Sequence, residues 1–108
     1  MITRKQLAKQ VNVSLRTISR WEIAIANSNT EFGRVYFSFD NSKYLYQFQE
    51  ISLKVFAIRR IVEGHSISET LTILESDYHK FLIPTDNNYQ YRRHTEAIQL
   101  LIRSGEND

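Results

Sequence analysis

Residues 1–22, MITRKQLAKQVNVSLRTISRWE, combine a helical apolar spacing with an excess of positive charge. Glu22 is the only acidic residue in this stretch. Its five basic residues are Arg4, Lys5, Lys9, Arg16 and Arg20. Apolar residues recur at intervals of three and four, as they do on the inner face of a helix. The stretch is therefore typical of a small helical unit with a basic outer face.

Capping signals mark the first helix and the turn that follows it. Thr3 and, three residues later, Gln6 form a capping-box pattern, which predicts a helix over residues 4–10. Asn12 comes next and tolerates the left-handed backbone that a tight turn needs. The first helix is thus expected to end in a short turn that leads directly into a second one.

The second helix is expected to begin after Ser14, a preferred capping residue, and to run from residue 15 to residue 23 or 24. Ile18 and Trp21 lie three positions apart and are predicted to point inward. The residues on the opposite side are then free to meet another molecule.

Composition and length bound the class of protein. The chain has 108 residues, of which 42% are apolar and 24% charged, as in an ordinary globular domain. It has no cysteine, which excludes a disulfide framework and a thiolate metal site. Neither a membrane-spanning run nor a secretory signal is recognisable. We therefore expect a cytoplasmic protein.

Charge is distributed unevenly along the chain. Residues 1–64 contain ten Lys or Arg and five Asp or Glu, a net charge of +5, and residues 65–108 contain four and seven, a net charge of −3. This asymmetry suggests that the first part meets a polyanion, although chance unevenness is the alternative.

Residues 33–46 have a different pattern. Val35, Phe37 and Phe39 alternate with more polar residues, and the turn-forming residues 40–42 follow. The next four residues are again strand-like. Alternation on both sides of a polar turn predicts a β-hairpin.

A longer helix is predicted from residue 47 or 48 to Glu63, with Gly64 as its stop. Ser66 and, three residues later, Glu69 form another capping box, which predicts a short helix that ends near residue 74.

This order of elements resembles the MerR-type winged helix-turn-helix domain over residues 2–75. The matching residues are Leu7-Ala8-Lys9, Val13-Ser14, Thr17-Ile18, Trp21-Glu22, Tyr46, Ile51 and the run Ile58–Leu74. The resemblance implies a mainly α fold with a small β-hairpin wing. It also implies a DNA-binding domain over residues 1–75 and a C-terminal extension over residues 76–108.

The chain departs from the family pattern in several places. Ser19 and Arg20 stand where an arginine and a tyrosine are common, and the hairpin is longer than usual. The family's long C-terminal dimerisation helix is missing, or is replaced by a final helix over about residues 89–103. No effector-binding domain follows, and the cysteines of the metal-sensing members are absent.

The resemblance implies a sequence-specific protein that binds double-stranded DNA, with the helix over residues 14–24 in the major groove and the hairpin over residues 33–46 as a wing. An arginine can grip guanine or phosphate with two donors, and hydroxyl groups suit phosphates or base edges. The predicted contact residues are Arg4, Lys5, Ser14, Arg16, Thr17, Ser19, Arg20, Arg34, Tyr36 and Lys43.

Several of these residues also have a purely structural interpretation, without contact to DNA. The arginines of the second helix can be a solvated face, and Tyr36 can pair across the hairpin. Arg4 and Lys5 lie in a first helical turn, where the helix dipole disfavours cations. Either a bound phosphate or an ion pair with a distant acid would explain them.

The final helix carries an apolar face formed by Ile98, Leu101 and Ile102, which can serve either as a dimer seam or as packing against the body of the chain. The three histidines do not have the spacing of a metal site, and no catalytic motif is present. We therefore expect no enzyme activity, no cofactor and no small-molecule ligand.

Together these features predict a transcriptional regulator that acts as a homodimer on DNA in the bacterial cytoplasm, at the nucleoid. Two alternatives remain. The first is an excisionase-like or DNA-architectural accessory protein, which would use the same contacts. The second is a protein–protein adaptor that kept the fold and lost DNA binding.

Overall fold

The computed structural model describes residues 2–39 and 43–81, and every structural statement below refers to these residues. Their regular elements are all helical. They are α1 (Arg4–Gln10), α2 (Leu15–Asn27), α3 (Glu31–Tyr36), α4 (Gln47–Ala57), the π-helical turn η1 (Ile58–Val62), α5 (Ile67–Asp77) and the 3₁₀ turn η2 (Tyr78–Phe81).

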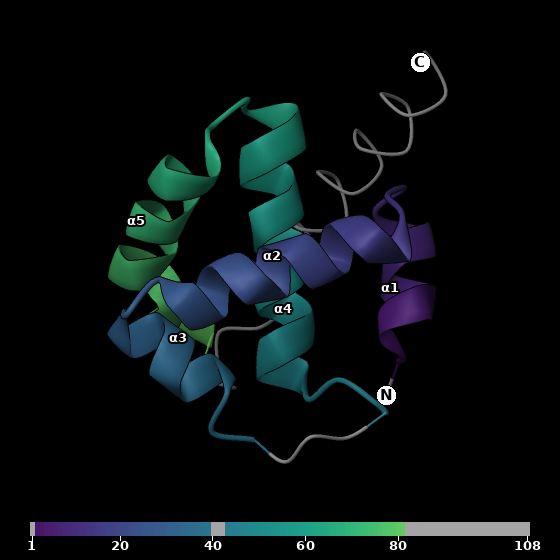
Figure 1. Ribbon diagram of the computed structural model, residues 1–108, viewed down its shortest axis with the longest axis horizontal. Coiled ribbons are helices and arrows are strands. Elements are labelled where there is room, and N and C mark those ends of the chain that lie inside the picture. The colour runs from purple at the N-terminus through teal and green to yellow at the C-terminus, as the bar shows by residue number, and fades with distance from the viewer. Residues whose placement is uncertain (1, 40–42, 82–108) are drawn as a thin grey trace.

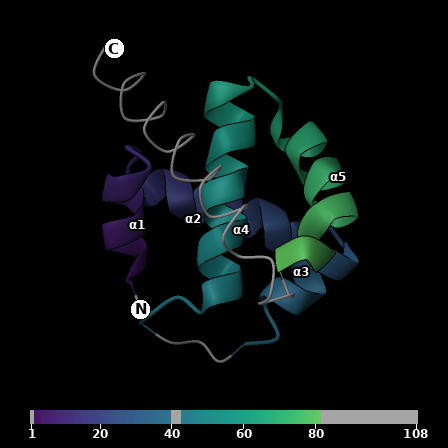
Figure 2. The same cartoon turned by 180° about the vertical axis from the view of Figure 1, so that it is seen from behind.

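Helix α2 lies across α4, with α1 packed near one end of α2 and α3 near the other (Figure 1). The reverse view shows α4 between α1 and α5 (Figure 2). At the crossing, the ring of Trp21 lies 5.2 Å from the ring of Phe56. Ile18 and Ile25 of α2 are fully buried in the same core. One face of α2 is therefore anchored along its length, and the opposite face is left to solvent.

The predicted first helix and turn are confirmed. Thr3 and Gln6 form the reciprocal capping box, and α1 covers residues 4–10. Asn12 has a positive φ of 59°, and the N–H of Val13 donates to the carbonyl of Ala8 over 2.9 Å. This is a Schellman motif, in which a left-handed residue ends a helix and satisfies its last carbonyls.

The second helix is also confirmed, with a later end than predicted. Ser14 accepts a hydrogen bond from the N–H of Thr17, and Ile18 and Trp21 are buried as expected. The helix continues to Asn27 rather than ending at residue 23 or 24. It is therefore longer by about one turn, and this turn carries Ile25 into the core.

The prediction of a β-hairpin wing over residues 33–46 is wrong. Residues 31–36 form α3, and residues 2–39 and 43–81 contain no β-strand. Tyr44 makes only an isolated antiparallel bridge with Thr3. The expected hairpin tip, residues 40–42, lies outside the described residues. The mainly α part of the predicted fold class stands, and the wing does not.

A helix is favoured at α3 because it brings two aromatic residues, four positions apart in the sequence, onto the same buried face. Phe32 and Tyr36 are both fully buried, with ring centroids 6.1 Å apart. The ring of Phe32 also lies 6.1 Å from that of Phe48 and 6.0 Å from that of Tyr78. A strand would place residues 32 and 36 about 13 Å apart, whereas a helix stacks them on one face.

The helices after α3 follow the predicted order. Helix α4 begins at Gln47, but its last turn widens into η1. Gly64 has a φ of 74°, and Ser66 forms a capping box at the start of α5. Helix α5 ends at Asp77, past the predicted domain limit at residue 75, and the buried Tyr78 continues the core.

Most of the predicted C-terminal extension lies outside the described residues. This includes the final helix and the predicted dimerisation residues Ile98, Leu101 and Ile102. Within the described part of the chain, the helices fall short of the length and apolarity needed to cross a membrane.

Candidate nucleic-acid interface

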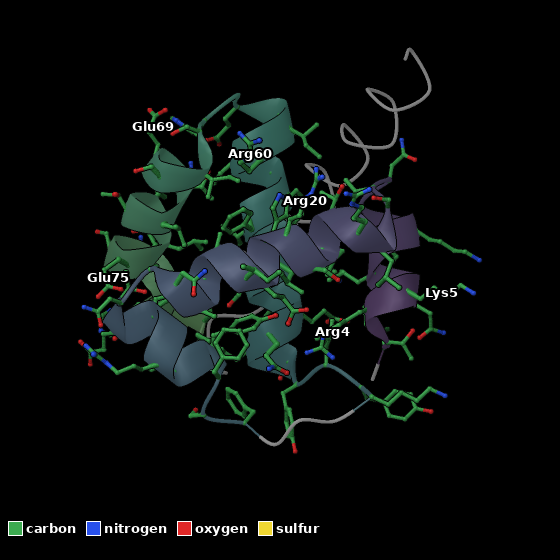
Figure 3. The ribbon with its side chains drawn as sticks, viewed as in Figure 1. Arg4, Lys5, Arg20, Arg60, Glu69 and Glu75 are labelled. Carbon is green, nitrogen blue, oxygen red and sulfur yellow. The ribbon has the colours of Figure 1, made fainter. Side chains whose placement is uncertain are left out.

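The solvent face of α2 carries Arg16, Ser19, Arg20 and Ile23, which we call the α2 stripe. All four residues are exposed, and they lie opposite the buried side of the helix. Their i, i+3, i+4, i+7 spacing places them on one side of α2. Figure 3 labels Arg20 on α2, near the point where this helix crosses α4. The stripe is therefore a continuous, solvent-facing row along the helix.

The only acidic residue of α2, Glu22, is turned away from this stripe. Its carboxylate accepts a bidentate hydrogen bond from Arg4, over 2.6 Å from Nε and 3.0 Å from Nη2. It also accepts a hydrogen bond of 2.9 Å from the hydroxyl of Tyr36. The side chain of Glu22 is only 13% exposed. The α2 stripe is thus positively charged, because its neighbouring acid is neutralised beneath the helix.

Electrostatics reinforce this arrangement. The hydrogen bond to Glu22 raises the pKa of Arg4, so its guanidinium stays charged. Burial, and then the negative charge of Glu22, raise the pKa of Tyr36, so its phenol stays protonated as a donor. The three side chains come from α1, α2 and α3. Their contacts therefore hold the first three helices in one relative orientation.

Helix α1 adds two exposed lysines, Lys5 and Lys9, one helical turn apart. In Figure 3, Lys5 extends away from the body of the molecule. Lys43 is brought near the start of α1, because the segment that follows it pairs with the residues just before this helix. The N–H of Leu45 donates to the carbonyl of Ile2 over 2.8 Å. Lys5 and Lys43 therefore lie near the start of α1, and Lys9 lies in its last turn.

The hydroxyl groups at the start of α2 are engaged with each other. The oxygens of Ser14 and Thr17 lie 3.0 Å apart, and Ser14 also caps the helix. Ser14 is exposed and Thr17 is partly buried. Both residues lie at the end of α2 that is nearest to α1, where a phosphate can approach the helix N-terminus.

The structure does not bring the remaining predicted contact residues into this group. Tyr36 is fully buried against Glu22, so its hydroxyl cannot reach a phosphate in this arrangement. Arg34 lies on α3, at the opposite end of α2 from α1, and lines a groove with Phe37. Arg4 makes the ion pair with a distant acid, one of the two alternatives that the sequence left open.

Two features of this face were not identified from the sequence. Ile23, 59% exposed, belongs to the α2 stripe, and its position seven residues after Arg16 was the available signal. The inward role of Glu22 depends on partners 18 and 14 residues away. No local pattern identifies such partners.

Nothing in the described part of the chain resembles a metal centre. No group of three or more His, Asp or Glu side chains among these residues is arranged to hold a metal ion.

Comparisons of the chain with protein-family models, with curated protein sequences and with solved structures find no match. The resemblance to MerR-type domains therefore stays a prediction from the residues quoted above.

Proposed function

We propose that this protein binds double-stranded DNA by placing α2 in the major groove. The observation that carries the proposal is the α2 stripe, in which two arginines are exposed while Glu22 is turned inward. An arginine reads guanine by donating to O6 and N7, or grips a phosphate through two parallel hydrogen bonds. An acid on the same face would repel the DNA backbone, and the pair with Arg4 prevents this.

The dimensions of α2 suit this role. The major groove is about 12 Å wide and admits one α-helix. The 13 residues of α2 extend for about 20 Å, so the stripe can follow several base pairs. Lys5, Lys9 and Lys43 are suited to phosphates on either side of the groove, where contacts set orientation rather than sequence preference.

The proposed biological role is transcriptional regulation by a dimer on a near-palindromic site. An excisionase-like or architectural protein would use the same helix. A discrete symmetric footprint beside a promoter supports regulation, and bending or cooperative coating of DNA supports the architectural role.

The central experiment replaces Arg16 and Arg20 together by alanine. DNA that binds the full chain is first selected from a random pool, and the affinity is then measured by fluorescence anisotropy. Each base or phosphate contact is worth about 1–3 kcal/mol, so we expect the double variant to bind at least about 30-fold more weakly. Both side chains are exposed, so the fold should be unchanged.

The matched control is Lys54→Ala with Lys80→Ala. It removes two positive charges that already pair with acids on neighbouring turns, at 3.7 Å from Glu50 and 3.6 Å from Asp77. We expect it to bind as the wild type does. Wild-type affinity should also fall steeply as salt rises, because phosphate contacts release counterions. Equal affinity of the arginine variant and the wild type would disprove the groove assignment.

A further inference from the structure

Ile23 is the most exposed of the large apolar side chains that the structure describes, at 59%. The rest of the α2 stripe is polar or charged. An exposed isoleucine gives a helix no favourable burial and has lower helix propensity than alanine. If the α2 stripe lies in the major groove, as proposed above, Ile23 meets the base edges there, and an apolar group is the partner that suits its side chain.

The position of Ile23 relative to the two arginines is fixed by helix geometry. It lies about 20° around the axis from Arg16 and about 10 Å farther along it. It lies about 4.5 Å along the axis beyond Arg20, slightly more than the 3.4 Å rise of one base-pair step. Arg20 and Ile23 therefore face neighbouring base pairs when α2 lies in the groove.

We propose that Ile23 contacts the 5-methyl group of a thymine, one or two base pairs from the base that Arg20 faces. Thymine alone among the four bases presents an apolar group in the major groove. The other base edges present hydrogen-bond donors and acceptors. An isoleucine placed against them would exclude water without making a hydrogen bond, which is unfavourable. This inference rests on the proposed function, and it adds which base the stripe selects.

Uracil provides the test, because it differs from thymine only by the missing 5-methyl group. Each thymine of the selected DNA site is replaced in turn by deoxyuridine, and the dissociation constant is measured for the wild type and for Ile23→Ala. We expect one thymine per half-site at which uracil weakens wild-type binding about fourfold, the effect of exposing one methyl-sized group. Ile23→Ala should bind the two DNAs equally.

The control variant is Ile61→Ala, which makes the same chemical change at an exposed position of η1, outside α2. It should keep both the wild-type affinity and the response to uracil. A DNA site that binds tightly but shows no uracil effect overturns the role of Ile23 and leaves DNA binding intact. A uracil effect that persists in Ile23→Ala also overturns it, because another residue then reads the methyl group.

Failure of the proposed function has a different signature. In that case the wild type enriches no DNA from the pool, and its affinity for any duplex is unaffected by replacing Arg16 and Arg20. The role of Ile23 then falls together with the proposed function.

Discussion

The α1–α2 unit and residues 30–39 both contain a capped helix, but the contacts that hold these helices in place differ. Each has a helix capped by a hydroxyl side chain, from Ser14 in one case and Thr30 in the other. The turn between α1 and α2 is closed by hydrogen bonds between residues no more than five positions apart. Helix α3 depends in addition on side chains from distant parts of the chain.

The contacts of α3 show this dependence. Glu75, from α5, accepts hydrogen bonds from the N–H groups of Phe32 over 2.9 Å and Glu31 over 3.3 Å. It lies beside the start of α3 (Figure 3). At the other end, Gln49 of α4 donates to the carbonyl of Tyr36 over 3.1 Å. A helix of only six residues is unstable alone, so these partners determine whether it forms.

Among the substitutions that test this comparison, Gly33→Val is expected to have the largest effect on stability. A Cβ atom at this position would lie 2.7 Å from the carbonyl oxygen of Ile25, so α3 must shift away from α2. We expect the free energy of unfolding to fall by at least about 2 kcal/mol, measured by urea denaturation. In a hairpin the same change would favour the strand, because valine has high β-propensity. Unchanged or increased stability would therefore contradict the helical assignment.

An intermediate effect is expected at alkaline pH from the hydrogen bond that links the two regions. Burial raises the pKa of Tyr36, so the native state keeps a proton that the unfolded state loses above about pH 10. The unfolded state then binds fewer protons, and stability falls as pH rises, by about 1.4 kcal/mol per pH unit. Tyr36→Phe removes this contribution, so its stability should fall less steeply between about pH 10 and 11.5. Parallel pH profiles would show that Tyr36 is not buried as described.

The smallest effects are expected from the two caps, and they should match. Ser14→Ala and Thr30→Ala each remove a side-chain acceptor from a helix N-terminus, which costs about 1 kcal/mol. Thr72→Ala removes an exposed hydroxyl from the interior of α5 and should be nearly neutral. Thermal unfolding of the three variants provides the comparison. A neutral Thr30→Ala beside a destabilising Ser14→Ala would mean that α3 is not capped as described.

The two regions also differ in how far they could be predicted. In the α1–α2 unit, the capping box, Asn12 and Ser14 indicate the same structure independently. In residues 31–39, the alternation of Val35, Phe37 and Phe39 favoured a strand, since aromatic and β-branched residues are common there. Phe32, Val35, Tyr36 and Phe39 also have helical spacing, and short apolar runs do not separate the two structures.

The residues of the candidate interface also fall into a group that local spacing could predict and a group that it could not. Arg16, Ser19 and Arg20 were placed on the outer face from the spacing of Ile18 and Trp21 alone, and the structure finds them exposed. The burial of Tyr36 and the ion pair of Arg4 were not predictable as a set. Both depend on Glu22, whose partners lie in two other helices.

Local sequence signals were sufficient to predict α1, its left-handed turn at Asn12 and the start of α2, because the hydrogen bonds of these features close within a few residues. Helical periodicity was likewise sufficient to predict which side of α2 faces solvent, since it separates Ile18 and Trp21 from the arginines. Whether residues 31–36 form a helix or a strand, in contrast, depends on contacts that exist only in the folded chain. That choice depends on Glu75, 43 residues from Phe32, and on aromatic rings that meet only when α4 and α5 are in place.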